Sequence, residues 1–240
     1  MDKKIVIVGA GVAGINAATK LVDNGYPGEL ITIIDMGKDP YKRLPEEVMT
    51  GMLGAGGWSD GKLTYHTAIG GQLSKYCGEE KAMELMDQVI TNFKRFHPKP
   101  EEVQCSNPIA EPEFIKPYFG LRLFPVWHVG TDYLSEIAKN WYDYLVSKGV
   151  KFIWKSKVTS IDFDINELKY EGPPISEVVK VLLYDELIFA TDPHTASNIL
   201  GDESLRGEVY SKKSLGGIGK LILLFKNPVR WKPLADNKPC

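Results

Sequence analysis

The stretch from Ile5 to Gly14, IVIVGAGVAG, decides the fold. Its first four residues are apolar and β-branched, which favours a buried strand. The glycines that follow, Gly9, Gly11 and Gly14, have the spacing GxGxxG. In a strand–turn–helix unit the first glycine permits the tight turn, the second lets the backbone approach a pyrophosphate, and the third lets helix and strand pack closely. The stretch therefore predicts an anion-binding turn at the start of a helix.

The residues after this turn complete a βαβ unit. Residues 15–24 have the apolar spacing of a helix, and Gly25 stands where a helix ends. Residues 30–34 are typical of a second strand, and Asp35 follows it, 21 residues after Gly14. A carboxylate at this place can accept hydrogen bonds from an adenosine ribose. The order of strand, glycines, helix, strand and acid predicts dinucleotide binding in an α/β, Rossmann-like fold.

The rest of the chain passes from a helical region back to sheet. Apolar residues at three- and four-residue intervals predict a helix over residues 79–96. Five prolines from Pro98 to Pro117 predict an irregular excursion after that helix. A second helix is expected between Gly130 and Gly149. Strands are expected at residues 150–154, 157–163, 177–183, 186–190 and 221–225.

The composition is that of an ordinary globular protein, with 240 residues, 43% hydrophobic residues and a formal net charge of −2. This balance gives no global electrostatic reason to bind nucleic acid or an anionic membrane. Three distant cysteines and four scattered histidines have no metal-ligand spacing, so no metal site is expected. No apolar run has the length of an export signal or a membrane span, and we expect a cytoplasmic protein.

Two segments resemble a known family. Residues 5–35 resemble the N-terminal motif of FAD-dependent oxidoreductases with the two-dinucleotide-binding-domain fold. Residues 184–200, where a strand ends in Ala190-Thr191 and leads into a short helix, resemble flavin-containing amine oxidases and phytoene-desaturase-like enzymes. The resemblance implies FAD as cofactor and a Rossmann-like FAD-binding domain with a parallel sheet and a β-meander, followed by the start of a second, substrate domain. The family usually has glutamate where this chain has Asp35, and the shorter carboxylate can still reach a ribose.

The resemblance also indicates cofactor contacts farther along the chain. Residues 157–161 resemble the strand whose backbone, near Val158, touches the adenine in such flavoproteins. Residues 54–62, together with 119–132, resemble stretches of little-characterised FAD-dependent dehydrogenases. Arg43 is a partner for an FAD phosphate or a 2′-phosphate, or else a surface charge, and Trp58 packs on a ring or in the core. The candidate cofactor-binding residues are Gly9, Gly11, Val12, Ala13, Gly14, Asp35, Met36, Arg43, Gly56, Gly57, Trp58, Ser59, Val158, Ala190 and Thr191.

Two residues are candidates for catalysis. A lysine near N1 or N5 of a flavin can stabilise the anionic reduced ring or hold a water, and Lys62 lies in the glycine-rich stretch. The alternative for Lys62 is a solvated loop residue. His128 precedes the expected start of the second helix, where it faces the ring or a substrate, or else is an ordinary loop histidine.

The expected domains follow from these assignments. Residues 1–75 and 130–200 form a discontinuous FAD-binding domain, residues 76–129 a helical and proline-rich insertion, and residues 201–240 the beginning of the substrate domain. The family's flavoproteins close the FAD site with a C-terminal strand and a Gly-Asp motif. We therefore expect a second chain or a further C-terminal segment to complete the site; the alternative is a minimal variant with a reorganised FAD site.

The function expected from these residues is that of an FAD-dependent oxidoreductase. It would transfer a hydride between a small-molecule or modified-group substrate and the flavin, with amine or carbon–carbon bond oxidation as the reaction types. One alternative is an NAD(P)-dependent dehydrogenase that uses residues 9–35 for its nucleotide. Another is a non-catalytic FAD-binding subunit of a split flavoenzyme.

Overall fold

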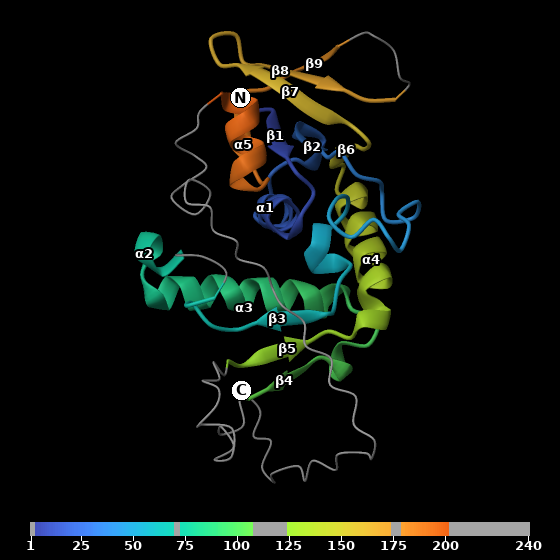
Figure 1. Ribbon diagram of the computed structural model, residues 1–240, viewed down its shortest axis with the longest axis vertical. Coiled ribbons are helices and arrows are strands. Elements are labelled where there is room, and N and C mark those ends of the chain that lie inside the picture. The colour runs from blue at the N-terminus through green and yellow to red at the C-terminus, as the bar shows by residue number, and fades with distance from the viewer. Residues whose placement is uncertain (1–2, 70–72, 108–123, 174–178, 202–240) are drawn as a thin grey trace, which may run out of the picture.

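A four-stranded parallel sheet forms the centre of the fold. The computed structural model describes residues 3–69, 73–107, 124–173 and 179–201. Within them the sheet has the strand order β10-β1-β2-β6 (Figure 1). Its strands are β1 (Ile5–Val8), β2 (Ile31–Ile34), β6 (Lys151–Ile153) and β10 (Glu186–Phe189). The α/β class with a parallel sheet is therefore confirmed.

Helix α1 (Val12–Asp23) connects β1 to β2, as the βαβ prediction requires. The helix begins three residues earlier than expected, because Gly11 has extended backbone, with φ −66° and ψ 178°, and serves as its N-cap. The third glycine of the motif is thus already helical. Gly25, with φ +84°, follows the helix, and a 3₁₀ turn, η1 (Gly28–Leu30), leads into β2.

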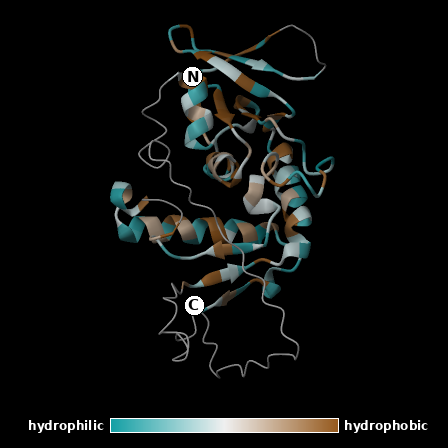
Figure 2. Cartoon of the chain, viewed as in Figure 1, coloured by the Kyte–Doolittle hydropathy of each residue, from teal (hydrophilic) through white to brown (hydrophobic). Residues whose placement is uncertain are grey.

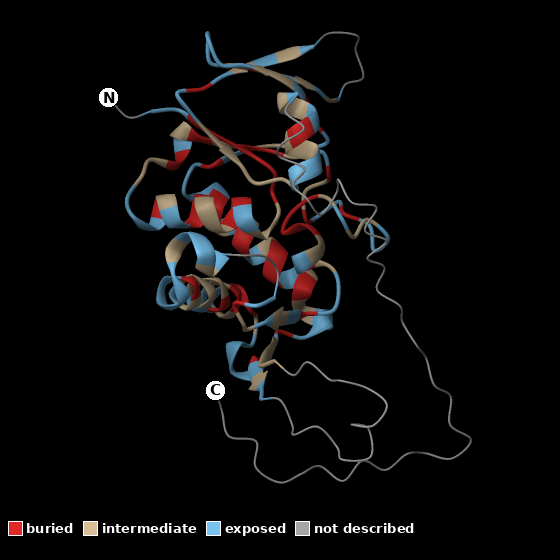
Figure 3. Cartoon of the chain, turned by 60° about the vertical axis from the view of Figure 1, so that its left-hand side comes forward, coloured by how far each residue is buried: buried red, intermediate tan, exposed pale blue. Residues whose placement is uncertain are grey.

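Helices α3 (Glu79–Phe96) and α4 (Leu134–Ser147) pack with α1 on one face of the sheet. The ring of Trp141 on α4 lies 4.8 Å from the ring of Phe96 and 5.5 Å from that of Phe93. Its Nε1 donates a 2.7 Å hydrogen bond to the hydroxyl of Thr19 on α1. Figure 3 shows in red that buried residues gather in the parallel strands and on the facing sides of these helices.

A three-stranded antiparallel meander covers the other face (Figure 1). It consists of β7 (Lys157–Asp162), β8 (Glu167–Glu171) and β9 (Lys180–Leu183). The meander was expected, but β8 itself was not located from the sequence. Val158 and Leu168 pack here against Val6 and Ile34 of the parallel sheet, and α5 (Pro193–Leu200) packs beside β7.

A second antiparallel sheet lies beneath α3 in the view of Figure 1, with the strand order β3-β5-β4. Its strands are β3 (Lys62–Thr64), β4 (Gln104–Ser106) and β5 (Val126–His128), and the remaining short elements are α2 (Leu73–Cys77), η2 (Gly54–Gly57), η3 (Pro100–Glu102) and η4 (Thr131–Tyr133). Figure 2 shows hydrophobic and hydrophilic residues alternating in α3, the helix above this sheet. The sequence predicted an irregular excursion here. Between Pro100 and Pro108 the chain nevertheless forms β4, a three-residue strand at the edge of the sheet, where proline is tolerated.

Three predictions fall wholly or partly outside the described residues, and one of them is the part of the irregular excursion from Pro108 to Pro117. The strand expected at 221–225 and the substrate domain expected at 201–240 also lie outside them, apart from Gly201, and the division into domains stays a prediction. Among the described residues, no helix combines the length and apolar character needed to cross a membrane. The same residues contain no group of three or more His, Cys, Asp and Glu side chains placed to hold a metal ion.

Candidate dinucleotide-binding site

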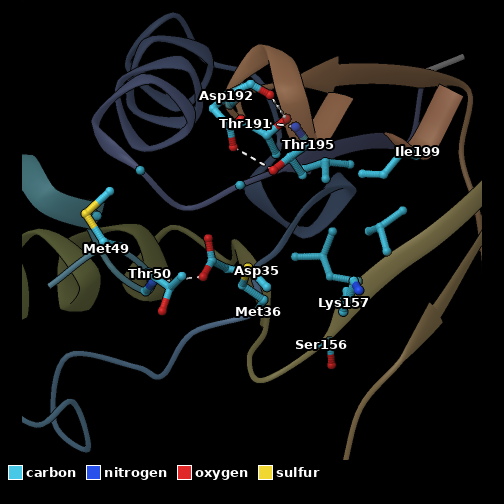
Figure 4. Close-up of a pocket in the computed structure, with 18 of the residues that line it drawn as sticks. Asp35, Met36, Met49, Thr50, Ser156, Lys157, Thr191, Asp192, Thr195 and Ile199 are labelled. Atoms are coloured by element: carbon cyan, nitrogen blue, oxygen red, sulfur yellow. Dashed lines mark hydrogen bonds between the residues drawn. The ribbon is translucent and has the colours of Figure 1, made fainter. Parts of the chain in front are cut away.

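A pocket of about 580 Å³ lies where β1, β2 and β10 end (Figure 4). Val8 and Gly9, Ile34 and Asp35, and Ala190 and Thr191 line it at these three strand ends. In parallel α/β sheets, ligands bind at the carboxyl ends of the strands. The predicted residues that line this pocket are Gly9, Gly11, Asp35, Met36, Val158, Ala190 and Thr191.

The three glycines of the turn have different surroundings. A Cβ added at Gly9, where φ is +108°, would lie 2.6 Å from the carbonyl oxygen of Ala190. A Cβ at Gly14 would lie 2.0 Å from the carbonyl oxygen of Gly9. A Cβ at Gly11 would meet nothing within 4 Å, although Gly11 lines the pocket. The first and third glycines are therefore required by packing, whereas the second leaves open space beside the helix.

The N-terminus of α1 faces this region without a capping side chain. The N-cap residue Gly11 has no side chain to accept a hydrogen bond, and no acidic residue lies in the first turn. The first N–H groups of a helix have no partners within the helix, and they carry the positive end of its dipole. Val12, Ala13 and Gly14 supply these groups here. The geometry is suited to an anion.

Asp35 uses most of its hydrogen-bonding capacity within the chain. Its Oδ2 accepts the N–H of Ala10 at 2.7 Å, and its Oδ1 accepts those of Gly37 at 2.7 Å and Gly51 at 2.9 Å. A carboxylate can accept about four hydrogen bonds, so little capacity is left for a ribose. Asp35 therefore joins the glycine turn to the loop that follows β2, and the predicted ribose contact stays a prediction.

That loop, residues 36–53, is called the pocket loop below. Met36, Met49, Thr50 and Gly51 line the pocket from it. It contains neither a helix nor a strand beyond the isolated bridge of Leu53 to Gly11. The Leu53 N–H also donates to the carbonyl oxygen of Ala10 at 2.7 Å. The far end of the pocket loop therefore lies directly against the glycine turn.

Arg43 is buried inside the pocket loop, with 6% of its surface exposed. Its guanidinium donates to the carbonyl oxygens of Glu47 at 2.8 Å, Val48 at 2.7 Å, Met52 at 2.6 Å and Gly54 at 3.0 Å. The same group lies 4.5 Å above the ring of Trp58. Burial lowers the pKa of Arg43. Of the five N–H donors of an arginine, these bonds leave at most one for a phosphate.

The glycines of η2 are explained by packing. A Cβ at Gly56 would lie 2.5 Å from Cγ2 of Val12, and one at Gly57 would lie 2.3 Å from Cβ of Leu53. Gly54 lines the pocket, whereas Gly56, Gly57, Trp58 and Ser59 are not among the described residues that do so. The sequence predicted that these glycines approach the cofactor closely. In the structure, Gly56 and Gly57 instead approach side chains of the chain itself, those of Val12 and Leu53.

The wall opposite Asp35 is formed by α5 and its N-cap, whose residues were not predicted to contact a cofactor (Figure 4). Asp192 caps this helix by accepting the N–H groups of His194 and Thr195, both at 3.0 Å, and the Thr195 hydroxyl at 2.6 Å. These hydrogen bonds, led by the hydroxyl, lower the pKa of Asp192. Thr195 and Ile199 then line the pocket one turn apart. The short helix was expected after Ala190-Thr191, and its N-cap Asp followed by Pro is the sequence signal that marks where it begins.

Lys62 and His128 come together elsewhere, on the β3–β5 pair, where they are direct register partners. The Lys62 ammonium lies 3.6 Å from the Asp60 carboxylate, with the lysine side chain 55% exposed. His128 Nε2 lies 2.9 Å from the Ser106 hydroxyl. Neither residue is among the described residues that line the pocket.

Comparisons with known proteins found only weakly similar solved structures. No protein-family model matches the chain, and no curated protein matches it. A flavoprotein/dehydrogenase from Cytophaga hutchinsonii is 17% identical, with a TM-score of 0.41, over 78% of this chain and 39% of that protein. Glycine oxidase from Geobacillus kaustophilus is 14% identical, with a TM-score of 0.46, over 82% of this chain and 57% of the oxidase.

Fructosyl amine:oxygen oxidoreductase from Aspergillus fumigatus is 12% identical, with a TM-score of 0.47, over 82% of this chain and 50% of that enzyme. In each case the chain spans well under two thirds of the other protein's length. Identities and TM-scores of this size carry no argument about activity.

Proposed function

We propose that the chain binds FAD and acts as an FAD-dependent oxidoreductase. The observation that carries the proposal is the open space at Gly11, which lies in a pocket between the uncapped N-terminus of α1 and the end of β2. The reaction proposed is hydride transfer between a small-molecule or modified-group substrate and the flavin, with amine or carbon–carbon bond oxidation as its types. The resemblance of residues 5–35 and 184–200 to flavoproteins supports this choice.

The residues present fit the adenosine diphosphate part of FAD. Gly11, Val12 and Ala13 would hold the pyrophosphate, because Gly11 borders open space in the pocket and the positive end of the helix dipole attracts negative charge. Met36 and Val158, which line the pocket, would contact the adenosine. A volume of about 580 Å³ lies within the usual range of small-molecule sites. When bound, the flavin supplies the redox chemistry, and the protein supplies position and electrostatics.

Lys62 and His128 are proposed to serve the reaction rather than cofactor binding. A lysine contributes a point positive charge, and a histidine can exchange a proton near neutral pH. Their shared position on the β3–β5 pair supports a common role. A second chain or C-terminal segment that completes the site, and a cytoplasmic location, stay predictions.

The test uses Gly11→Ala. Gly11 has a backbone conformation open to any residue, and the added methyl group meets no neighbour, so the variant should fold like the wild type. We expect FAD affinity to fall by about tenfold or more, because the methyl group occupies the space for the pyrophosphate. Fluorescence titration of the purified protein with FAD measures this affinity. Thermal unfolding of both proteins checks that only binding has changed.

Other results would favour the alternatives. Binding of NAD(P)H without FAD would indicate an NAD(P)-dependent dehydrogenase. FAD that binds but cannot be reduced by any of a panel of amines and saturated acids, even with added partner chains, would indicate a non-catalytic subunit. Equal FAD affinity in the wild type and Gly11→Ala would show that the glycine turn does not contact the cofactor.

A further inference from the structure

The pocket loop has to satisfy its backbone polar groups without regular structure. Residues 36–52 form neither helix nor strand, and yet four of them line the pocket. Buried backbone N–H and C=O groups need hydrogen-bond partners. In this loop two charged side chains supply many of these partners: Asp35 at the base of the loop and Arg43 inside it.

The base of the loop is narrow. A Cβ at Gly37 would lie 2.2 Å from the backbone nitrogen of Gly51, so the first and last parts of the loop are in contact there. Asp35 bonds the N–H groups of both glycines through Oδ1. The base is also joined to the β6–β7 connection, where the backbone N–H of Lys155 donates to the Gly37 carbonyl oxygen at 2.7 Å.

Arg43 holds the second half of the loop from inside. Its bonds to the carbonyl oxygens of Glu47 and Val48 lie on one side of the segment Met49–Gly51, and those to Met52 and Gly54 lie on the other. Met49–Gly51 lines the pocket. The guanidinium therefore brackets the part of the loop that forms the pocket wall. A lysine cannot replace this arrangement, since an ammonium is a compact charge without the planar fork.

We propose that Arg43 is a positioning residue, which sets the affinity of the pocket for the adenosine part of a nucleotide without touching the nucleotide. The inference rests on the proposed function, because it assumes that the pocket holds such a group. It departs from both sequence readings of Arg43, a partner for a phosphate and a surface charge, since the side chain is buried. When Arg43 orders the pocket wall before the ligand binds, binding does not carry the entropy cost of ordering that wall. Loss of Arg43 adds this cost and therefore weakens binding.

Titration calorimetry with ADP, and NMR titration with adenosine, test the proposal on the wild type, Arg43→Lys and Arg43→Met. We expect Arg43→Met to weaken binding of both ligands by a similar factor of about ten or more, with Arg43→Lys close to it. Similar losses are expected because a displaced wall affects the adenosine that both ligands share. A phosphate partner would instead lower the affinity for ADP alone, and that result would overturn the proposal.

Arg95→Met is the matched control. Arg95 pairs with Asp23 at 2.7 Å and lies 4.3 Å above the Tyr144 ring, away from the residues that line the pocket. The ADP affinity of the Arg95→Met variant should stay within about twofold of the wild type, because substitutions at sites distant from the pocket act independently of it. If Arg43→Met does not fold, Arg43→Lys carries the comparison. Hydrogen exchange should then rise in residues 44–54 and remain unchanged in β1 and α4.

The two proposals fail in different ways. Wild-type protein that binds neither ADP nor FAD would overturn the proposed function and this inference with it. Wild-type protein that binds ADP with the same affinity as both folded Arg43 variants would overturn the positioning role alone.

Discussion

Lys62 and His128 lie directly opposite each other on the antiparallel strands β3 and β5. Side chains at opposed positions project from the same face of a sheet, with Cβ atoms about 5 Å apart. The Ser106 hydroxyl, 2.9 Å from Nε2, further restricts the His128 ring. Two candidates selected separately from the sequence thus form one exposed cluster. The cluster can be tested without knowledge of the substrate.

Replacement of Lys62 by Met is expected to lower the two-electron midpoint potential of bound FAD by about 30 mV, which corresponds to a tenfold loss of stabilisation of the reduced ring. The reason is that a nearby positive charge stabilises the anionic reduced flavin. Reductive titration of the FAD-loaded protein with dithionite measures the potential. Lys81→Met, which removes an exposed lysine paired with Glu84, is the control. An unchanged potential would assign Lys62 to a solvent-facing role.

Replacement of Asp35 by Asn is expected to lower the free energy of unfolding by about 1–3 kcal/mol, because an amide places an NH₂ group where one of the three backbone N–H donors now points. Urea unfolding measures the loss. Asp185→Asn, at an exposed carboxylate that accepts the Lys4 N–H, should cost less. An equal loss in both variants would contradict the joining role of Asp35.

The ribose contact of Asp35 has a separate test. If Asp35 also accepts a ribose hydroxyl, the wild type should bind ADP more tightly than 2′-deoxy-ADP, and Asp35→Asn should lose this preference. We expect a small preference of about threefold, since most of the carboxylate's capacity is used within the chain. Calorimetric titration of both proteins with both nucleotides gives the comparison.

The cap of α5 should make stability depend on pH below about 4. Hydrogen bonds from Thr195 and His194 lower the pKa of Asp192 in the folded protein. The contribution of the cap is therefore complete above the unfolded-state pKa and is lost as pH falls through the folded-state pKa. At neutral pH Asp192→Ala should cost about 1 kcal/mol, and the cost should shrink in acid. Urea unfolding at pH 7 and pH 3 measures both values, and a cost that does not change with pH would contradict the cap.

Replacement of Gly14 by Ala is expected to destabilise the fold by about 1–3 kcal/mol or more, since the new Cβ would lie 2.0 Å from the Gly9 carbonyl oxygen. Gly11→Ala is the matched change within the same turn, and its unfolding temperature should fall much less, by no more than the N-cap preference for glycine over alanine. Calorimetric melting compares the two. A wild-type melting temperature for Gly14→Ala would show that the turn can relax away from the helix.

The βαβ unit could be predicted from sequence because its signals are local. The apolar residues of β1, the spacing of Gly9, Gly11 and Gly14, and Asp35 at the next strand end all act on their own segment or its immediate neighbour. The same reasoning located α3 with the bounds observed. Short strands were harder, because three residues of β4 or β5 are too few for an alternating pattern to stand out.

The role of Arg43 could not be predicted, because its partners are backbone carbonyls of a loop without a repeating pattern. Nothing in the identity of Glu47, Val48 or Met52 marks them as acceptors. In the same way, Gly56 and Gly57 were predicted to be cofactor contacts, whereas the side chains of Val12 and Leu53 lie against them. A glycine-rich stretch indicates close approach, but the sequence does not say to what.

Leu53 limits how far this site can be redesigned. Its side chain is fully buried, and yet its φ of 63° is in the left-handed region that disfavours every branched or bulky residue. Glycine would relieve backbone strain of about 1–2 kcal/mol but would lose about 2 kcal/mol of apolar burial and open a cavity. Asparagine adopts that conformation more readily, but its side-chain amide would be buried in the core without hydrogen-bond partners. Substitution libraries aimed at the pocket should therefore vary Met36, Met49 and Thr50 and leave position 53 alone, because neither the backbone nor the core can improve there without harm to the other.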